Sequence, residues 1–202
     1  MKKAICILII FGTISLCCKE EKKEVVIKKA KVEVPHHTTW GKVAVSLEET
    51  PDQFLNQNIH LLSRTDEDSN ASYIYTGKIA VDYASTYRVS ILAKKTESNN
   101  LMGLRIQGEY PDRVDAVFNL ETGELVEVLK GRDFENESAS IEAIGDDWYR
   151  CSVMAEVTAD EVLILIGPTT AENKVNGWES KTNEPCQINI IPSSITFERT
   201  AL

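Results

Sequence analysis

A polar stretch near the end of the sequence contains a tryptophan in a setting suited to binding. Trp178 follows Gly177 within PTTAENKVNGWESKTNEP, where no alternating pattern predicts its burial. An exposed indole ring can stack on the C–H face of a pyranose while polar neighbours reach the hydroxyl groups. The alternative is a tryptophan that folds back over the end of the domain.

A polar patch is expected where two neighbouring segments, LMGLRIQGEYPDR and RVDAVFNL, alternate between apolar and polar residues. Alternation places the apolar residues inward and the polar residues outward. On a concave sheet this patch can bind sugar hydroxyls through paired hydrogen bonds, whereas the alternative is a solvated sheet face with one cross-strand ion pair. The patch consists of Arg105, Gln107, Asp115 and Asn119, and Tyr110 begins the turn between the segments.

The sequence DDWYRCSV contains a second aromatic candidate. On a strand, Trp148 and Arg150 face one way, and Tyr149 and Cys151 face the other. Trp148 can stack on a sugar ring while Arg150 binds its hydroxyls or an acid group. The alternative is structural, with Trp148 at the core edge and Arg150 in an internal ion pair.

Metal ligands are sparse. Two acidic turns, Asp66-Glu67-Asp68 and Asp146-Asp147, can supply oxygen ligands to Ca²⁺, although no EF-hand spacing is present. A structural Ca²⁺ ion therefore stays open beside the alternative of solvated turns, and no other cofactor is expected. His36 and His37 have no third ligand nearby, which favours solvated histidines.

Catalytic residues are equally sparse. The only histidine after residue 39 is His60, and no GxSxG elbow is present. A carboxylate pair for glycoside hydrolysis cannot be picked out among 31 acidic residues. The protein is therefore expected not to be an enzyme.

The elements that must position these residues are short segments of alternating character, separated by polar turns. Eleven candidate strands after Trp40 fit an all-β sandwich or barrel, and the only helix-like start follows Thr50-Pro51-Asp52. The turn Glu121-Thr122-Gly123-Glu124 predicts an antiparallel hairpin over 113–130. The expected strands are 41–48, 58–64, 72–78, 86–95, 101–109, 113–120, 124–130, 139–144, 147–157, 161–167 and 187–199.

The strand over 86–95 has two distinct faces. Tyr87, Val89, Ile91 and Ala93 share one face and predict a packed side. The other face, with Arg88, Ser90 and Lys94, is expected to be wet, as in a sandwich sheet.

The N-terminal 18 residues have the order of a secretory leader. A basic start, Met1-Lys2-Lys3, precedes a short apolar run that ends at Cys17 and Cys18, followed at once by KEEKKE. Such leaders are typical of bacterial lipoproteins, in which one cysteine is lipidated; the smaller residue before the cut favours Cys18 over Cys17. Residues 19–39 are interpreted as a charged linker, and residues 40–202 as the domain.

Charge and cysteine content limit the remaining possibilities. Removing Lys2 and Lys3 leaves 20 basic against 31 acidic residues, a net charge of −11 that disfavours nucleic acid and anionic lipid. Cys151 and Cys186 then remain in the domain. They can form a disulfide in an oxidising compartment or stay as buried free thiols.

Residues 70–199 resemble the jelly-roll carbohydrate-binding modules found beside polysaccharide lyases, glycoside hydrolases and phage tail fibres. The resemblance lies in the order YRVSILAKK, FNLETGE and GDDWYRCSV, although two aspartates replace the usual single residue before Trp148. It implies a jelly-roll β-sandwich of two antiparallel sheets that binds carbohydrate, often with a structural calcium.

The sequence thus predicts a non-catalytic, lipid-anchored module that binds polysaccharide at the outer membrane or cell surface, near other glycan-uptake proteins. Two alternatives stay open. One is a structural or adhesion lipoprotein that binds a protein partner, and the other is a small polysaccharide lyase or hydrolase.

Overall fold

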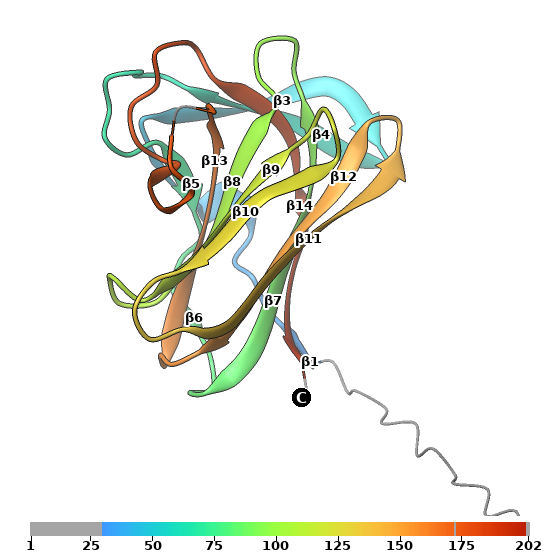
Figure 1. The fold of residues 1–202 in the computed structure, drawn as a ribbon. Coiled ribbons are helices and arrows are strands. Elements are labelled where there is room, and N and C mark those ends of the chain that lie inside the picture. Colours follow the sequence, from blue (N-terminus) through green and yellow to red (C-terminus); the bar gives the residue numbers. More distant parts are fainter. Residues whose placement is uncertain (1–29, 172, 201–202) are drawn as a thin grey trace, which may run out of the picture.

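The protein is a sandwich of two antiparallel β-sheets (Figure 1), as seen in a computed structural model that describes residues 30–171 and 173–200. The first sheet has the order β11-β12-β7-β14-β4-β3, with β1 beside β14. The second sheet has the order β10-β9-β8-β13-β5-β2, with β6 beside β13. This arrangement confirms the predicted all-β sandwich and is compatible with a jelly roll.

The strands of the first sheet are β1 (Ala30–Val32), β3 (Val45–Phe54), β4 (Gln57–Arg64), β7 (Ser85–Lys95), β11 (Glu135–Gly145), β12 (Trp148–Val157) and β14 (Gln187–Thr200). Those of the second are β2 (Gly41–Val43), β5 (Tyr73–Tyr75), β6 (Ile79–Ala80), β8 (Leu101–Gln107), β9 (Arg113–Asn119), β10 (Glu124–Lys130) and β13 (Glu161–Thr169). Two 3-10 turns, η1 (His37–Thr39) and η2 (Val175–Gly177), interrupt the connections. Each of the eleven predicted strands is present, at least in part.

The core lies between the sheets and is built by alternation along the strands. Tyr87, Val89, Ile91 and Ala93 of β7 face it from the first sheet, as predicted. Met102, Leu104 and Ile106 of β8, with Val114, Ala116 and Phe118 of β9, face it from the second. The outer side of β7 is wet only in part, because Arg88 and Lys94 are half-buried while Ser90 and Leu92 are buried there.

Backbone turns explain where the sequence prediction succeeded and failed. Gly123 has φ of 70° in the turn between β9 and β10, which confirms the predicted hairpin. The helix-like start after Thr50-Pro51-Asp52 forms no helix, because β3 continues to Phe54 and turns through Leu55 and Asn56, both at positive φ. Ala44, at φ of 46°, divides the predicted strand 41–48 between the two sheets.

The domain begins earlier than the expected boundary at residue 40. Strand β1 pairs with β14, aligning Ala30 with Arg199 and Val32 with Phe197, and the buried Trp40 donates its indole N–H to the carbonyl of Pro35 at 2.7 Å. The leader, Cys17 and Cys18, and linker residues 19–29 lie outside the described residues. Within the described part, no helix is long and apolar enough to span a membrane.

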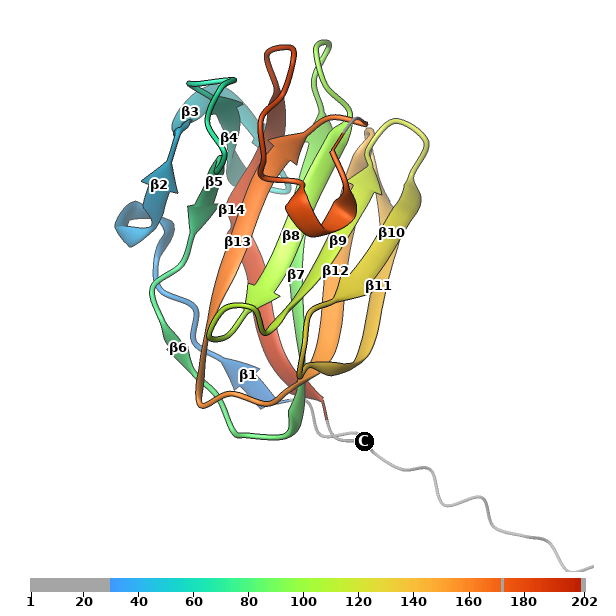
Figure 2. The same cartoon turned by 60° about the vertical axis from the view of Figure 1, so that its left-hand side comes forward.

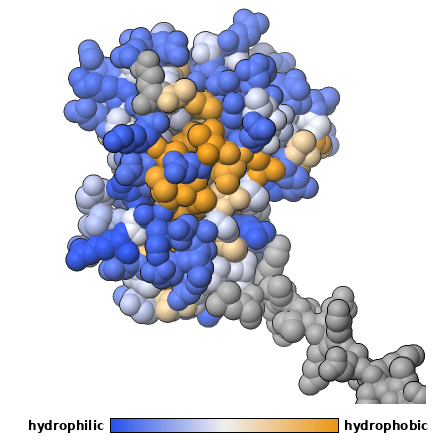
Figure 3. Space-filling model, in the orientation of Figure 1, coloured by the Kyte–Doolittle hydropathy of each residue, from blue (hydrophilic) through white to orange (hydrophobic). Residues whose placement is uncertain are grey.

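The two ends of the sandwich differ. The described chain enters at β1, beside the C-terminal part of β14, and long loops project from the opposite end (Figures 1 and 2). Figure 3 shows apolar residues gathered in the middle of one side, over β10, where Val126 is exposed.

Cys151 and Cys186 are both buried free thiols, so the disulfide alternative is not realised.

Candidate functional site

Trp178 is fully buried, so its expected exposure is wrong. The segment between β13 and β14 folds back over the outer face of the second sheet, and the indole lies against Gly103 and Gly167. A Cβ atom added to Gly103 would come within 2.1 Å of the indole, and one added to Gly167 within 2.8 Å. Glycine at these positions leaves the space that the ring occupies. The alternative of a tryptophan folded back onto the domain is the one the structure shows.

Under this segment, Arg105 and Asp115 form a buried ion pair with Nε to Oδ1 at 2.5 Å. The Trp178 indole N–H donates to the same Asp115 oxygen at 3.0 Å, and Arg113 donates to the other at 2.8 Å. Arg105 also donates to both carboxylate oxygens of Glu179 at 2.9 Å. Burial raises the pKa of the Asp115 carboxyl, and the two guanidinium groups oppose that effect. The charged groups of Arg105, Asp115 and Glu179 therefore bind one another rather than a ligand.

The predicted polar patch is therefore brought together only in part, and it is covered. Gln107 accepts from Arg105 at 3.3 Å, but Asn119 serves the next turn, where its side-chain oxygen accepts from the backbone N–H groups of Glu121 and Thr122. Arg105 and Asp115 have 2% and 1% exposure. As arranged here, they hold the covering segment in place rather than face solvent.

Arg64 anchors the same segment from β4. Its guanidinium donates to the backbone carbonyls of Pro168, Trp178 and Ser180 at 3.2, 3.0 and 2.6 Å. Burial lowers the pKa of this group. With three carbonyls fixed by one side chain, the segment is a packed part of the fold, and nothing in the sequence pattern indicated this role for Arg64.

Trp148 is also buried, on the outer face of the first sheet with Leu92 and Ile191. Its ring stacks on Phe54 with centroids 5.2 Å apart. The predicted division of faces is confirmed, because Cys151 points into the main core. The expected internal ion pair of Arg150 is wrong, since Arg150 pairs at 3.1 Å with Glu142 on the surface.

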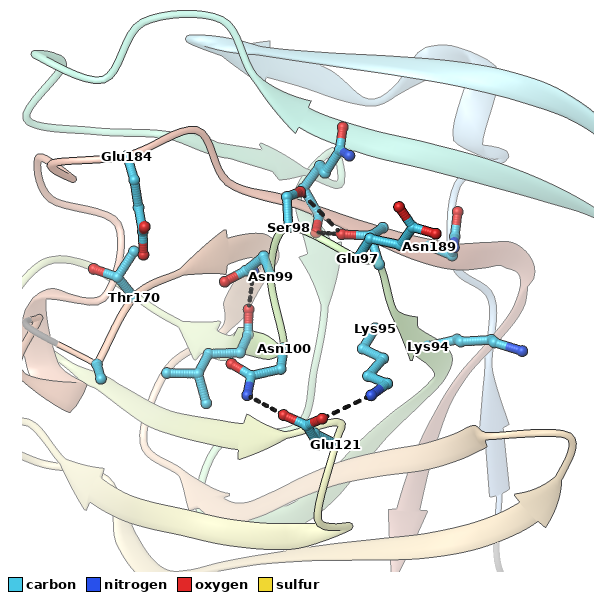
Figure 4. A pocket seen from close by; sticks show the side chains of 14 residues that line it. Lys94, Lys95, Glu97, Ser98, Asn99, Asn100, Glu121, Thr170, Glu184 and Asn189 are labelled. Carbon is cyan, nitrogen blue, oxygen red and sulfur yellow. Dashed lines mark hydrogen bonds and ion pairs between the residues drawn. The ribbon is translucent and has the colours of Figure 1, made fainter.

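An open cleft of about 800 Å³ lies at the loop end of the sandwich (Figure 4), and we call it the end cleft. Its walls come from the end of β7 and the following loop, the β9–β10 turn, the residues just after β13, and the residues on either side of Cys186. Glu184 and Thr170 stand on one side and Lys95 on the other. The lining side chains with polar groups are Lys94, Lys95, Thr96, Glu97, Ser98, Asn99, Asn100, Glu121, Thr170, Glu184, Gln187 and Asn189.

Glu121 organises one wall of the end cleft. Its carboxylate accepts from Lys95 at 2.8 Å and from Asn100 at 3.1 Å. These hydrogen bonds hold the pKa of Glu121 below its usual range, and Glu121 raises the pKa of Lys95. The wall thus presents ionised groups in fixed positions at neutral pH.

Sequence analysis missed the end cleft. Its residues lie in loops without alternation or a known motif, and they meet only because β7, β9 and β14 end at the same end of the sandwich. The available signal was compositional: TESNN after β7 is dense in hydrogen-bonding side chains. Such a run is also typical of any solvated loop.

The two acidic turns are held by local hydrogen bonds in the structure. Among the described residues, no group of three or more His, Cys, Asp and Glu side chains is placed to hold a metal ion. Asp66 accepts from the backbone N–H of Asp68, and Lys94 donates to the carbonyl of Asp146 at 2.7 Å.

Comparison with known proteins assigns no function. No family model matches the chain, and no curated protein matches it.

Proposed function

We propose that the protein binds a polysaccharide without cleaving it, through the end cleft. The observation that carries this proposal is the lining: amide, hydroxyl, carboxylate and ammonium groups from separate loops surround an open volume of about 800 Å³. That volume lies within the range of small-molecule sites. A polyhydroxylated ligand suits it because sugar hydroxyls both donate and accept, as the lining amides do.

The electrostatics of the cleft favour recognition over chemistry. Glu121 is held ionised by Lys95 and Asn100, so it suits accepting hydrogen bonds from a ligand better than delivering a proton. None of the described residues that line this cleft is aromatic. Binding would depend on hydrogen bonds that compete with water, so weak affinity for a single sugar unit is expected.

The proposed cellular location follows from the leader. If lipid at Cys18 or Cys17 anchors the chain to the outer membrane or cell surface, the tether joins the domain at β1. The end cleft lies at the other end of β14 from β1, so it would face away from the membrane and towards glycan. Neighbouring glycan-uptake proteins could then receive the captured chain.

The test is a glycan screen, with and without a chelator, followed by titration of variants. Asn100→Ala removes an amide from the cleft, and we expect about tenfold weaker binding, equivalent to about 1.4 kcal/mol. Asn176→Ala is the matched control, because it deletes an exposed side-chain amide that lies outside the cleft lining. The bond between Arg113 and residue 176 uses the backbone carbonyl, which the variant keeps. Equal binding by both variants, or no ligand across algal, plant and host glycans, would overturn the proposal. Loss of binding with chelator alone would add Ca²⁺ to the site.

A further inference from the structure

Two tyrosine rings are exposed at the opposite end of the sandwich. Among the Phe, Tyr and Trp side chains of the described residues, only Tyr83 and Tyr110 are largely exposed, at 64% and 70%. Tyr83 lies in the connection between β6 and β7, and Tyr110 lies in the turn between β8 and β9. Exposed aromatic rings are costly to solvate and are typical of recognition surfaces.

A second cleft, of about 640 Å³, opens between these turns. Tyr83 lines it directly, and Glu109 and Asp112, which flank Tyr110 in its turn, form part of the wall. The turn between β12 and β13 closes the remaining side with Thr158 and Asp160. We call this space the tyrosine cleft.

Tyr110 stands on a rigid support. The guanidinium carbon of Arg113 lies 5.1 Å from the centre of the Tyr110 ring. Arg113 is itself fixed, because it donates to Asp115 at 2.8 Å and to the carbonyl of Asn176 at 2.8 Å. A ring held in this way on a cation loses little conformational freedom when a ligand stacks on it.

The charge of the tyrosine cleft restricts its ligands. Four carboxylates line it, from Glu109, Asp112, Asp160 and Glu161, and the one lining lysine, Lys78, is paired with Glu161. Acidic sugars such as uronates would be repelled by this surplus of negative charge. Carboxylate oxygens are also good acceptors for the hydroxyl groups of uncharged sugars.

We infer that the tyrosine cleft is a second saccharide-binding site, which accepts uncharged sugar rings by stacking and rejects uronates. The inference takes only its ligand class from the proposed function, since the residues are different and lie at the other end of the molecule. A chain of sugars held at two ends would gain avidity over either site alone.

The experiment is NMR titration of the isotope-labelled protein, residues 19–202, without the leader but with both cysteines of the domain. The probes are a β-glucan oligosaccharide, a xylo-oligosaccharide, an N-acetylglucosamine oligosaccharide and, as the acidic arm, oligogalacturonate. At least one uncharged probe should shift the amides of 79–84 and 108–112, and oligogalacturonate should not. Tyr83→Ala should weaken that binding about tenfold, whereas Tyr83→Phe, which keeps the ring, should retain it.

Leu55→Ala is the matched control, because it removes an exposed apolar side chain outside the tyrosine cleft. Shifts confined to 96–100 and 184–189 would overturn the second site and leave the proposed function standing. Shifts confined to the tyrosine cleft would support the second site and overturn the end cleft. Stronger binding of oligogalacturonate at the tyrosine cleft, or no shifts with any probe, would overturn the inference.

Discussion

The outer face of the second sheet and the end cleft carry similar kinds of side chain, yet they differ in what covers them. On the sheet face, Arg105 forms ion pairs with Asp115 and Glu179. The segment between β13 and β14 covers them, and its Trp178 donates a hydrogen bond to Asp115. In the end cleft, Glu121 and Lys95 are paired as well, but their side chains are 55% and 36% exposed. The difference shows that residue type suggests a binding surface, whereas coverage decides whether a ligand can reach it.

Space for the covering segment comes from missing side chains. Gly103 and Gly167 lie on adjacent strands, where β8 pairs with β13 and aligns these two residues. Their missing Cβ atoms make a shallow site that the indole fills, and Leu101, Val117, Leu165 and Val175 pack around it. The result is a small second core outside the sandwich, with the buried charges at its edge.

The largest effect is expected from Trp178→Ala. Removing the buried ring leaves a cavity over the sheet and takes a hydrogen-bond donor from Asp115, so unfolding free energy should fall by about 3–5 kcal/mol. Chemical denaturation measures this change. A variant of unchanged stability that had lost glycan binding would instead restore Trp178 as a ligand-binding residue.

A smaller loss is expected from Gly103→Ala. The added methyl would meet the indole at 2.1 Å, so the ring must shift and overpacking should cost about 1–3 kcal/mol. Gly177→Ala is the control, because its added methyl would meet only Ser180 at 3.4 Å. Equal melting temperatures for the two variants would contradict the close packing of the Trp178 indole against Gly103.

A substitution in the end cleft should weaken ligand binding but change stability little. Asn100→Ala should change unfolding free energy by less than about 1 kcal/mol, because the lost hydrogen bond joins it to the exposed Glu121. Measured beside Trp178→Ala, it separates a residue kept for binding from one kept for folding. A loss of stability as large as that of Trp178→Ala would erase the contrast between the two regions.

The smallest effect is expected from reducing agents. Burial raises the pKa of the Cys151 thiol far above its ordinary value, and Cys186 is buried as well. Neither thiol should react with an alkylating reagent until the protein unfolds, and a reductant should leave the melting temperature unchanged. Peptide mapping after alkylation checks both sites, and a Cys151–Cys186 disulfide in the native protein would refute this prediction.

Much of the fold could be predicted because strand formation leaves a local record. Alternation in β7, β8 and β9 identified their inward residues, and Gly123 marked the hairpin. The strand through Thr50 was hidden behind a helix-like start, and its turn through Leu55 and Asn56 lacks a glycine signal. The short strand β6 was missed because two residues are too few to show a period.

The candidate site was less predictable. The prediction that Arg105 and Asp115 share one face of neighbouring strands is confirmed, and the structure adds that β8 and β9 pair them directly. It could not show that a segment more than 60 residues away would bury them, as the contact from Trp178 to Asp115 does.

The sequence by itself determined the all-β class, most of the inward residues and the acidic character of this protein, because alternation is visible among neighbouring residues and charge follows from composition. Tertiary structure alone decided which polar surface is covered and which is open. The reason is physical: burial depends on the return path of a long loop, and that path was set by two glycines and by Arg64, which no local pattern connects.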